Sequence, residues 1–396
     1  MNNSHSSRRA TTLRVMPTVP LETKGFVKLK RSDAVRYGVV GLGHIAQTAV
    51  LPAFKHAQQN SRLVALFSDD AMKRLELGRR YHVPHVVGYQ DYEAFLEEGR
   101  LDAVYIALPN SMHCDFVIRA ARAGVHILCE KPLGLSEREC RVMIAVCKRN
   151  QVKLMTAYRL HFEKANLEAM NLSQSGRIGE LRYFNSIFSM QARAPNIRLD
   201  QDMGGGPLWD LGVYCINAAR NLFREEPVEV MGVTATGRDK RFQEVEEMVS
   251  ATLLFPGERL ASFICSFGAA DAAVYEVVGT KGRVSIEHAY EYAQRIEMDT
   301  TIGERKAVRS FKLRDQFAPE LLYFSDCILR NREPEPSGLE GLADVRIVEA
   351  IYKSAKTKKP ARLARLLKST RPSLRQEVSL APVRKPELVH AKGGIT

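Results

Sequence analysis

The chain has 396 residues, of which 45% are hydrophobic and 26% charged, values that are ordinary for globular proteins. Its net charge of +13 is concentrated at the two ends: residues 1–33 carry +5, residues 353–396 carry +10, and residues 34–352 carry −2. The length allows two domains, and the central part is not basic enough for a domain-wide nucleic-acid footprint.

The seven cysteines are scattered between positions 114 and 327 and form no Cys-x-x-Cys pair. This spacing argues against a disulfide framework and against a zinc site, so we expect no metal. Arg8-Arg9 is not followed by the apolar stretch of roughly 7–15 residues found in export signals. No run approaches the ~18 apolar residues of a membrane span, and we expect a cytoplasmic protein.

Residues 1–33 are rich in Ser, Arg, Lys and Pro and are expected to form an N-terminal arm. A buried strand at 37–40 then runs into Gly41-Leu42-Gly43-His44-Ile45-Ala46, and a helical pattern follows to residue 56. In this context the motif predicts dinucleotide binding, because Gly41 permits the tight turn and Gly43 lets a pyrophosphate approach the backbone. We place Gly41, Gly43, His44 and Ile45 in the cofactor site.

The next strand, expected at 63–67, ends where such domains read the adenosine ribose. An NAD site usually presents an acid at this point, but here Ser68 comes first, followed by Asp69-Asp70 and by Lys73-Arg74. Ser68, Lys73 and Arg74 would clasp the 2′-phosphate of NADP, whereas the two acids keep NAD possible. In the alternative interpretation, Ser68 or Asp69 caps a helix and both cations are solvated. We favour NADP.

Strands and helices alternate up to residue 157, which predicts a doubly wound Rossmann domain over residues 34–157. Helices are expected at 71–81, 91–98, up to 123 and 136–150, and strands at 86–87, 102–108, 125–129 and 152–157.

Two of these strands end in polar residues, and ligands of an open parallel sheet bind outside the carboxyl ends of its strands. One end reads Leu108-Pro109-Asn110 with His113 close behind, and the other reads Glu130-Lys131-Pro132. We therefore assign cofactor contacts to Leu108, Pro109, Asn110, His113, Glu130 and Lys131. The alternatives are that Asn110 caps the following helix and that Glu130 and Lys131 are solvated.

After Tyr158-Arg159-Leu160-His161-Phe162 the pattern changes from alternation to a succession of strands. Beyond a helix at 163–172, β-branched and aromatic runs recur at 181–190, 228–236, 246–255, 259–268, 273–278, 283–288, 294–299 and 307–313. They predict an α+β domain over residues 158–355 with a large open, mainly antiparallel sheet. An uncovered sheet face normally pairs with another subunit, so we expect a homo-oligomer, a dimer or tetramer. Residues 356–396 are expected to form a basic tail.

Within the second domain, Gly204-Gly205-Gly206-Pro207 predicts a flexible loop that opens a helix. Asp210 and Tyr214 follow at a spacing of four and share one helix face. The spacing alone leaves open whether they line a site or serve as a first-turn acid and a core aromatic.

The glycine turn, Pro109-Asn110, Glu130-Lys131-Pro132 and the Gly204–Asn217 stretch, in this order, resemble the glucose–fructose oxidoreductase/inositol dehydrogenase/MocA (Gfo/Idh/MocA) family over about residues 34–355. Asp210–Arg220, Tyr158–Phe162 and the Ser68…Lys73 pattern are similar to the glucose–fructose oxidoreductase branch, where that last pattern accompanies NADP. Unlike the secreted members of that branch, this chain is expected to carry no export signal.

The resemblance implies hydride transfer between a nicotinamide cofactor and a hydroxyl-bearing carbon of a sugar or polyol. A tyrosine hydroxyl has a reference pKa of about 10, too high for an efficient base near neutrality, and a nearby lysine favours the phenolate. We therefore assign Tyr214 as general acid/base, Lys131 as its electrostatic partner and substrate ligand, and Asp210 as the residue that orients a substrate hydroxyl. Arg159 is a further candidate for contacts with the substrate or the cofactor. Arg198 is a further candidate for contacts with the substrate.

The alternative from another class is a non-catalytic, cofactor-binding regulator of the same fold, with basic tails that engage nucleic acid or a partner. Because the fold alone does not need Lys131, Asp210 and Tyr214 together, we favour the enzyme, and we expect neither nucleic acid nor a membrane as partner. In the branch that the chain resembles, an N-terminal arm packs on a neighbouring subunit and covers the cofactor, so residues 15–31 are expected to dock. The alternative is a disordered leader whose apolar residues have no role.

Overall fold

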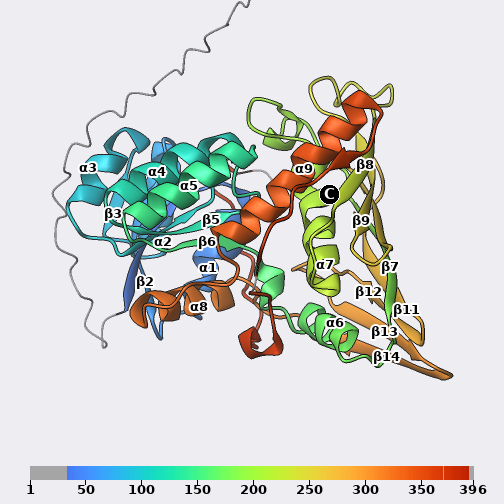
Figure 1. Ribbon diagram of the computed structural model, residues 1–396. Helices are drawn as coiled ribbons and strands as arrows, with labels where there is room; N and C mark the ends of the chain where they lie inside the picture. The colour runs from blue at the N-terminus through green and yellow to red at the C-terminus, as the bar shows by residue number, and fades with distance from the viewer. Residues whose placement is uncertain (1–33, 369, 392–396) are drawn as a thin grey trace, which may run out of the picture.

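The computed structural model describes residues 34–368 and 370–391, and the predicted N-terminal arm lies outside them. Two sheets organise these residues, each in a domain of its own (Figure 1).

The first sheet is the predicted parallel sheet of a dinucleotide-binding domain. It consists of β1 (Val35–Val40), β2 (Ser61–Phe67), β3 (His85–Val87), β4 (Ala103–Ile106), β5 (His126–Glu130) and β6 (Leu154–Ala157). All its pairs are parallel, and the strand order is β3-β2-β1-β4-β5-β6. The chain changes winding direction between β1 and β4, which is the switch point where dinucleotides bind in this class of sheet.

The helices of this domain begin at local sequence signals. After the glycine turn come a π-helical segment, Ala46–Val50, and α1 (Leu51–Ala53), and the other helices are α2 (Ala71–Arg80), α3 (Tyr92–Glu97), α4 (His113–Arg122) and α5 (Glu137–Arg149). Ser136 caps α5 by accepting from the Glu139 amide at 3.1 Å. The cap of α2 is Asp70, so the interpretation that Ser68 or Asp69 caps this helix is wrong.

The second sheet has nine strands in the order β14-β13-β12-β11-β7-β10-β9-β8-β15. Its bounds are β7 (Leu181–Ser189), β8 (Glu229–Ala235), β9 (Met248–Phe255), β10 (Arg259–Ser266), β11 (Ala272–Gly279), β12 (Gly282–Glu287), β13 (Ile296–Ile302), β14 (Arg305–Phe311) and β15 (Ala361–Arg362). Only β7 and β10 pair in parallel, so the prediction of a large, mainly antiparallel sheet is confirmed.

One face of this sheet is covered by α6 (Lys164–Gln174), α7 (Val213–Phe223) and α9 (Gly338–Thr357), as Figure 1 shows. Alternation along each strand places apolar side chains on both faces. On the uncovered face, the large exposed residues are Tyr183, Ile187, Met231, Val233, Met248, Leu260 and Ile264.

Two helices that the sequence patterns did not predict connect the domains. Helix α8 (Ala318–Leu329) returns to the first domain, where Leu321 and Phe324 are fully buried in the core beneath β1 and β2. Helix α9 contacts α5 and β6 on one side and β8 on the other. After α9 the chain adds β15 to the sheet edge and then runs between the domains, shown in dark red in Figure 1.

No helix in the described part of the chain combines the length and the apolar character needed to cross a membrane.

Candidate active site at the domain junction

The glycine turn after β1 has the space that a dinucleotide requires. Gly41 has φ +92°, and a Cβ there would lie 2.4 Å from the Ala107 carbonyl oxygen, so only glycine fits. A Cβ on Gly43 would meet nothing within 4 Å, which leaves the outer side of the turn open. His44 and Ile45 follow, half-buried, at the start of the π-helical segment, so the residues fit a pyrophosphate.

The end of β2 carries the residues predicted to read the ribose. Ser68 is buried, and its backbone carbonyl accepts from the Arg74 guanidinium. Asp69 accepts from the Tyr89 amide at 3.0 Å, and Asp70 accepts from the Lys73 amide at 3.0 Å as the cap of α2. The Lys73 amide hydrogen bond is the main cause that lowers the pKa of Asp70. Both acids therefore have partners within the protein, and Arg74 contacts Ser68 while Lys73 Nζ lies 4.0 Å from Asp70.

The ends of β4 and β5 are held together by His113, which is fully buried. Its Nδ1 lies 2.9 Å from the Pro132 carbonyl oxygen and its Nε2 lies 3.0 Å from that of Leu108. Burial lowers the pKa of His113, and a neutral imidazole can donate to only one of these carbonyls. The structure thus places His113 between the two strand ends, where it supports Leu108 and the Lys131-Pro132 turn.

Asn110 links the two domains instead of capping a helix. Its Nδ2 donates to the Gly204 carbonyl at 2.8 Å, and the turn Asn110–Met112 begins at Pro109 without a side-chain cap. The expectation that Asn110 caps the following helix is therefore wrong. Gly204 has φ +77°, and a Cβ there would collide with Asn110 and Leu135, so the glycine loop approaches the first domain closely.

Lys131, Asp210 and Arg198 form a cluster of ion pairs where the domains meet. Lys131 Nζ lies 2.7 Å from Asp210 Oδ1, and Arg198 Nε lies 2.6 Å from Asp210 Oδ2. Burial raises the pKa of Asp210, but Arg198 and Lys131 together hold it well below its usual value. Burial likewise opposes the charge on Lys131, yet Asp210 and its neighbours raise the pKa of Lys131 above its ordinary value. All three side chains remain charged near neutrality.

Tyr214 lies against this cluster in the first turn of α7, directly after a π-helical segment, Leu208–Gly212, that contains Asp210. Lys131 Nζ is 4.8 Å from the centre of the Tyr214 ring, and the Arg159 guanidinium carbon is 5.2 Å from it. Segments of this helical type often occur at functional sites. The structure thus brings together Lys131, Asp210, Tyr214, Arg159 and Arg198, as the sequence predicted.

The Arg159 side chain is buried and is held by two acceptors of the second domain. It donates to the Gln316 side chain and to the Tyr290 carbonyl. Glu130 is turned toward the first sheet, where it accepts from the Tyr105 hydroxyl at 2.7 Å. Burial raises the pKa of Glu130.

The sequence patterns did not indicate the residues that the stretch 290–320 adds to the site. Tyr292 lies under the Arg159 guanidinium, and Glu320 is fully buried with neither carboxylate oxygen hydrogen-bonded. Burial, followed by the neighbouring Glu130, raises the pKa of Glu320 well above its ordinary value. These residues follow no motif, so no spacing signal could have identified them.

Both domains match sequence profiles of one family. Residues 35–158 match the GFO/IDH/MocA oxidoreductase family, NAD-binding Rossmann fold, and residues 166–285 match the GFO/IDH/MocA C-terminal domain.

Solved structures and curated relatives agree with these matches. An aldose–aldose oxidoreductase from Caulobacter crescentus, solved with glycerol, is 37% identical with a TM-score of 0.80, over 83% of this chain and 100% of that chain. A 3-ketoreductase from Actinomadura kijaniata, solved with NADP and TDP-benzene, is 26% identical with a TM-score of 0.75, over 81% of this chain and 98% of that chain. A D-xylose 1-dehydrogenase [NADP(+)] from Haloarcula marismortui is 30% identical over 339 residues, which are 84% of this chain and 94% of that protein.

Proposed function

We propose that this chain, which belongs to the Gfo/Idh/MocA family of oxidoreductases, transfers a hydride between NADP and a hydroxyl-bearing carbon of a sugar or polyol. The similar proteins named above are a D-xylose 1-dehydrogenase, an aldose–aldose oxidoreductase and a 3-ketoreductase solved with NADP and TDP-benzene. The observation that carries the proposal is the cluster of Lys131, Asp210 and Arg198 against Tyr214, at the edge of a dinucleotide-binding sheet. The family favours an enzyme over the non-catalytic regulator.

The bound nicotinamide would carry the hydride, and the protein would move the proton. Asp210 is held ionised and Lys131 is held protonated, so neither exchanges a proton readily near neutrality. Tyr214 is the remaining group of the cluster with an exchangeable proton. We therefore assign it as the general acid/base, and Lys131 and Arg159 stabilise the negative charge that develops on its oxygen.

Asp210 and Lys131 also offer substrate contacts. A carboxylate accepts from a substrate hydroxyl and an ammonium donates to its oxygen, which together fix the carbon that reacts. Arg198 neutralises the second Asp210 oxygen and limits how far that side chain can turn. We propose these three residues as the substrate-binding groups beside Tyr214.

The residues after β2 support NADP as the cofactor. Asp69 accepts from the Tyr89 amide and Asp70 caps α2, while the basic residues Lys73 and Arg74 lie in the first turn of α2, with Lys73 Nζ 4.0 Å from Asp70 and Arg74 donating to the Ser68 carbonyl. The double variant Lys73→Ala/Arg74→Ala should lose the preference for NADP over NAD in equilibrium titrations. A wild-type protein that prefers NAD would contradict this assignment.

A second copy of the chain is the partner that we propose for the uncovered sheet face. Its exposed apolar residues come from four adjacent strands, β7 to β10, an area that a monomer would leave in water. Ile187→Lys in the middle of β7 should lower the molar mass of the oligomer measured by light scattering. An unchanged molar mass would place the contact between subunits elsewhere.

We also propose a cytoplasmic location, since all seven cysteines are free thiols and six of them are buried.

The reaction is tested by mixing the protein and NADP with a panel of aldoses and polyols and following the absorbance of the reduced nicotinamide. Reduction with at least one sugar is expected. Tight NADP binding without reduction by any sugar or polyol would remove the proposed substrate class.

A further inference from the structure

The C-terminal segment, residues 361–391, has no part in the function proposed above. It follows the matched family regions, the second of which ends at residue 285. Its sequence is strongly basic, which led us to expect a tail. In the structure it packs along both domains.

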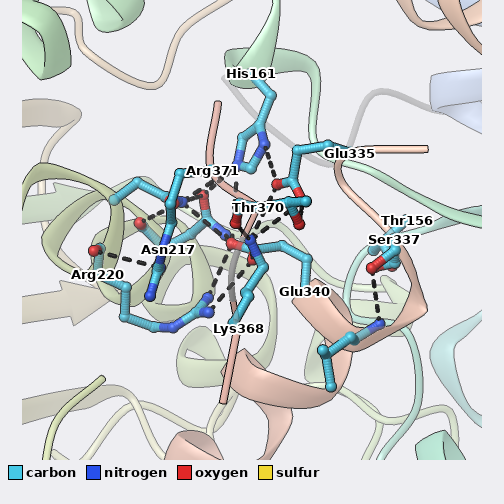
Figure 2. Close-up of polar contacts among 12 residues, drawn as sticks. Thr156, His161, Asn217, Arg220, Glu335, Ser337, Glu340, Lys368, Thr370 and Arg371 are labelled. Carbon is cyan, nitrogen blue, oxygen red and sulfur yellow. Dashed lines mark hydrogen bonds and ion pairs between the residues drawn. The ribbon is translucent and has the colours of Figure 1, made fainter. Parts of the chain in front are cut away.

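The segment is anchored by charge at the domain junction. Lys368 Nζ lies 2.7 Å from Glu340 and 3.2 Å from Glu335, and Arg371 lies 2.7 Å from Glu226. Figure 2 shows these two cations among His161, Asn217, Arg220, Glu335 and Glu340. Both cations are almost completely buried, and a buried charge is costly to leave unpaired, so the segment is firmly held at this point.

Beyond this anchor the segment reaches the glycine turn of the first domain. The amide of Val389 donates to Gln47 Oε1, and its carbonyl accepts from Gln47 Nε2, both at 2.8 Å. Gln47 Nε2 also donates to the Leu42 carbonyl at 2.9 Å, inside the turn. Val389 itself is buried in the core of the first domain. The segment therefore ends directly beside the turn that fits a pyrophosphate.

One basic side chain reaches the cofactor side with it. His390 Nδ1 lies 3.1 Å from Asp70 Oδ2, at the start of α2 and two residues from Ser68. The same oxygen lies 4.0 Å from Lys73 Nζ, so His390 is the closer of these two basic partners. His390 thus stands at the ribose side.

We propose that the C-terminal segment completes the dinucleotide site, with Val389 holding Gln47 at the pyrophosphate turn and His390 sharing with Lys73 the neutralisation of Asp70 so that a 2′-phosphate fits beside it. The proposal rests on NADP as the cofactor of the proposed function. A 2′-phosphate carries more than one negative charge, and an uncompensated carboxylate next to it would repel it. NAD lacks this group, so replacing His390 should change the affinity for NADP and leave the affinity for NAD unchanged.

The test uses the full-length chain and equilibrium titration with NADP and with NAD. His390→Ala should weaken NADP binding about three- to fivefold, as expected for a partly exposed ion pair, and leave NAD binding unchanged.

A double-variant cycle separates charge neutralisation from a general loss of structure. Asp70→Ser keeps a capping oxygen for α2 and removes the charge, so His390→Ala should have no effect on NADP in that background. Arg375→Ala, which removes an exposed cation from the same segment, is the matched control and should leave both titrations unchanged.

Unchanged NADP affinity in His390→Ala would overturn the proposal and leave the proposed function standing. Equal weakening of NADP and NAD by His390→Ala would overturn the role of His390. A wild-type chain that binds neither dinucleotide would overturn the proposed function, and this inference with it.

Discussion

The helical stretch from Leu208 to Phe223 has a charged cluster at each end, and the two clusters differ in what surrounds them. At its start, Asp210 binds Lys131 and Arg198, whose side chains keep 11% and 28% of their exposure. At its end, Arg220 binds Glu226, Glu340 and Asp344; the side chains of Arg220, Glu340 and Asp344 have no exposure, and that of Glu226 keeps 14%. We call the first the site cluster and the second the junction cluster.

The two clusters differ in their access to solvent and in how many partners hold each acid. In the junction cluster, Arg220 donates to three carboxylates and Asn217 donates to two of them, so the acids are held on several sides. In the site cluster, a single acid faces two cations, and half-buried Tyr214 lies beside them. The site cluster keeps part of its surface in contact with solvent, whereas the junction cluster ties α7 to α9.

Removing the Tyr214 hydroxyl should break the site cluster's chemistry with the largest effect. Tyr214→Phe keeps the ring against Lys131 and Arg159 but removes the acid/base, so kcat should fall by about 10²- to 10⁴-fold. Steady-state rates, with NADP titrations and thermal melts as controls, provide the measurement. A variant with near-normal turnover would show that Tyr214 is not the acid/base.

Removing the central cation of the junction cluster should instead lower the stability of the folded protein. Arg220→Met leaves Glu340 and Asp344 buried with one cation fewer, which costs about 3–5 kcal/mol of the free energy of unfolding. Chemical denaturation measures this loss. The matched substitution in the site cluster, Lys131→Met, should reduce stability far less and turnover far more. Equal losses of stability in the two variants would mean that the clusters do not differ in function.

The fold was largely predictable because its strands follow a local rule. Each β-branched or aromatic run expected in the second domain corresponds to one of β7 to β14, and turn residues separate them. Helices α8 and α9 were missed because both are buried around most of their circumference, which removes the polar face that periodicity relies on. The C-terminal segment escaped for another reason, since its structure depends on ion pairs with distant residues.

The candidate site was predictable where a motif placed residues on a strand end or helix turn. Lys131 and Tyr214 meet because the sheet order and the glycine loop bring their elements together. The pairing of Arg198 with Asp210 spans the glycine loop, and no helical or strand spacing indicates it. Glu320 and Tyr292 come from a stretch without motifs, and only packing places them near Arg159.

One acid from each cluster should also respond to pH in opposite directions, because Asp344 has a raised pKa and Asp210 a lowered one. Burial, with help from Glu340, raises the pKa of Asp344 to about 6, although Arg220 opposes this. The folded protein therefore binds this proton more tightly than the unfolded chain, so Asp344 favours folding increasingly as the pH falls from about 6 to about 4. Asp210 has a lowered pKa, so its contribution is present above about pH 4 and is lost below it.

Unfolding curves of Asp344→Asn and Asp210→Asn between pH 3 and pH 7 test this contrast. Relative to Asp344→Asn, the wild type should gain stability on the order of 2 kcal/mol as the pH falls from 7 to 4. Relative to Asp210→Asn, the wild type should lose stability as the pH falls below about 4. Parallel pH dependences of the two differences would contradict the assignment of opposite shifts.

The smallest expected effects come from cations at the edges of the clusters, where an acid keeps a second partner. Without Arg371, Glu226 still binds Arg220, so Arg371→Ala should cost about 1 kcal/mol and lower Tm by about 2–4 °C.

Without Arg198, Asp210 still binds Lys131, but its second oxygen is free to turn from the substrate. Arg198→Ala should therefore raise the KM for the sugar about three- to tenfold with little change in Tm, and Arg198→Lys should restore part of it. At saturating NADP, Arg371→Ala should leave kcat and this KM unchanged. A shift in KM for Arg371→Ala, or a shift in Tm alone for Arg198→Ala, would show that the junction cluster shapes the substrate site and that the two ends of the helical stretch act as one unit.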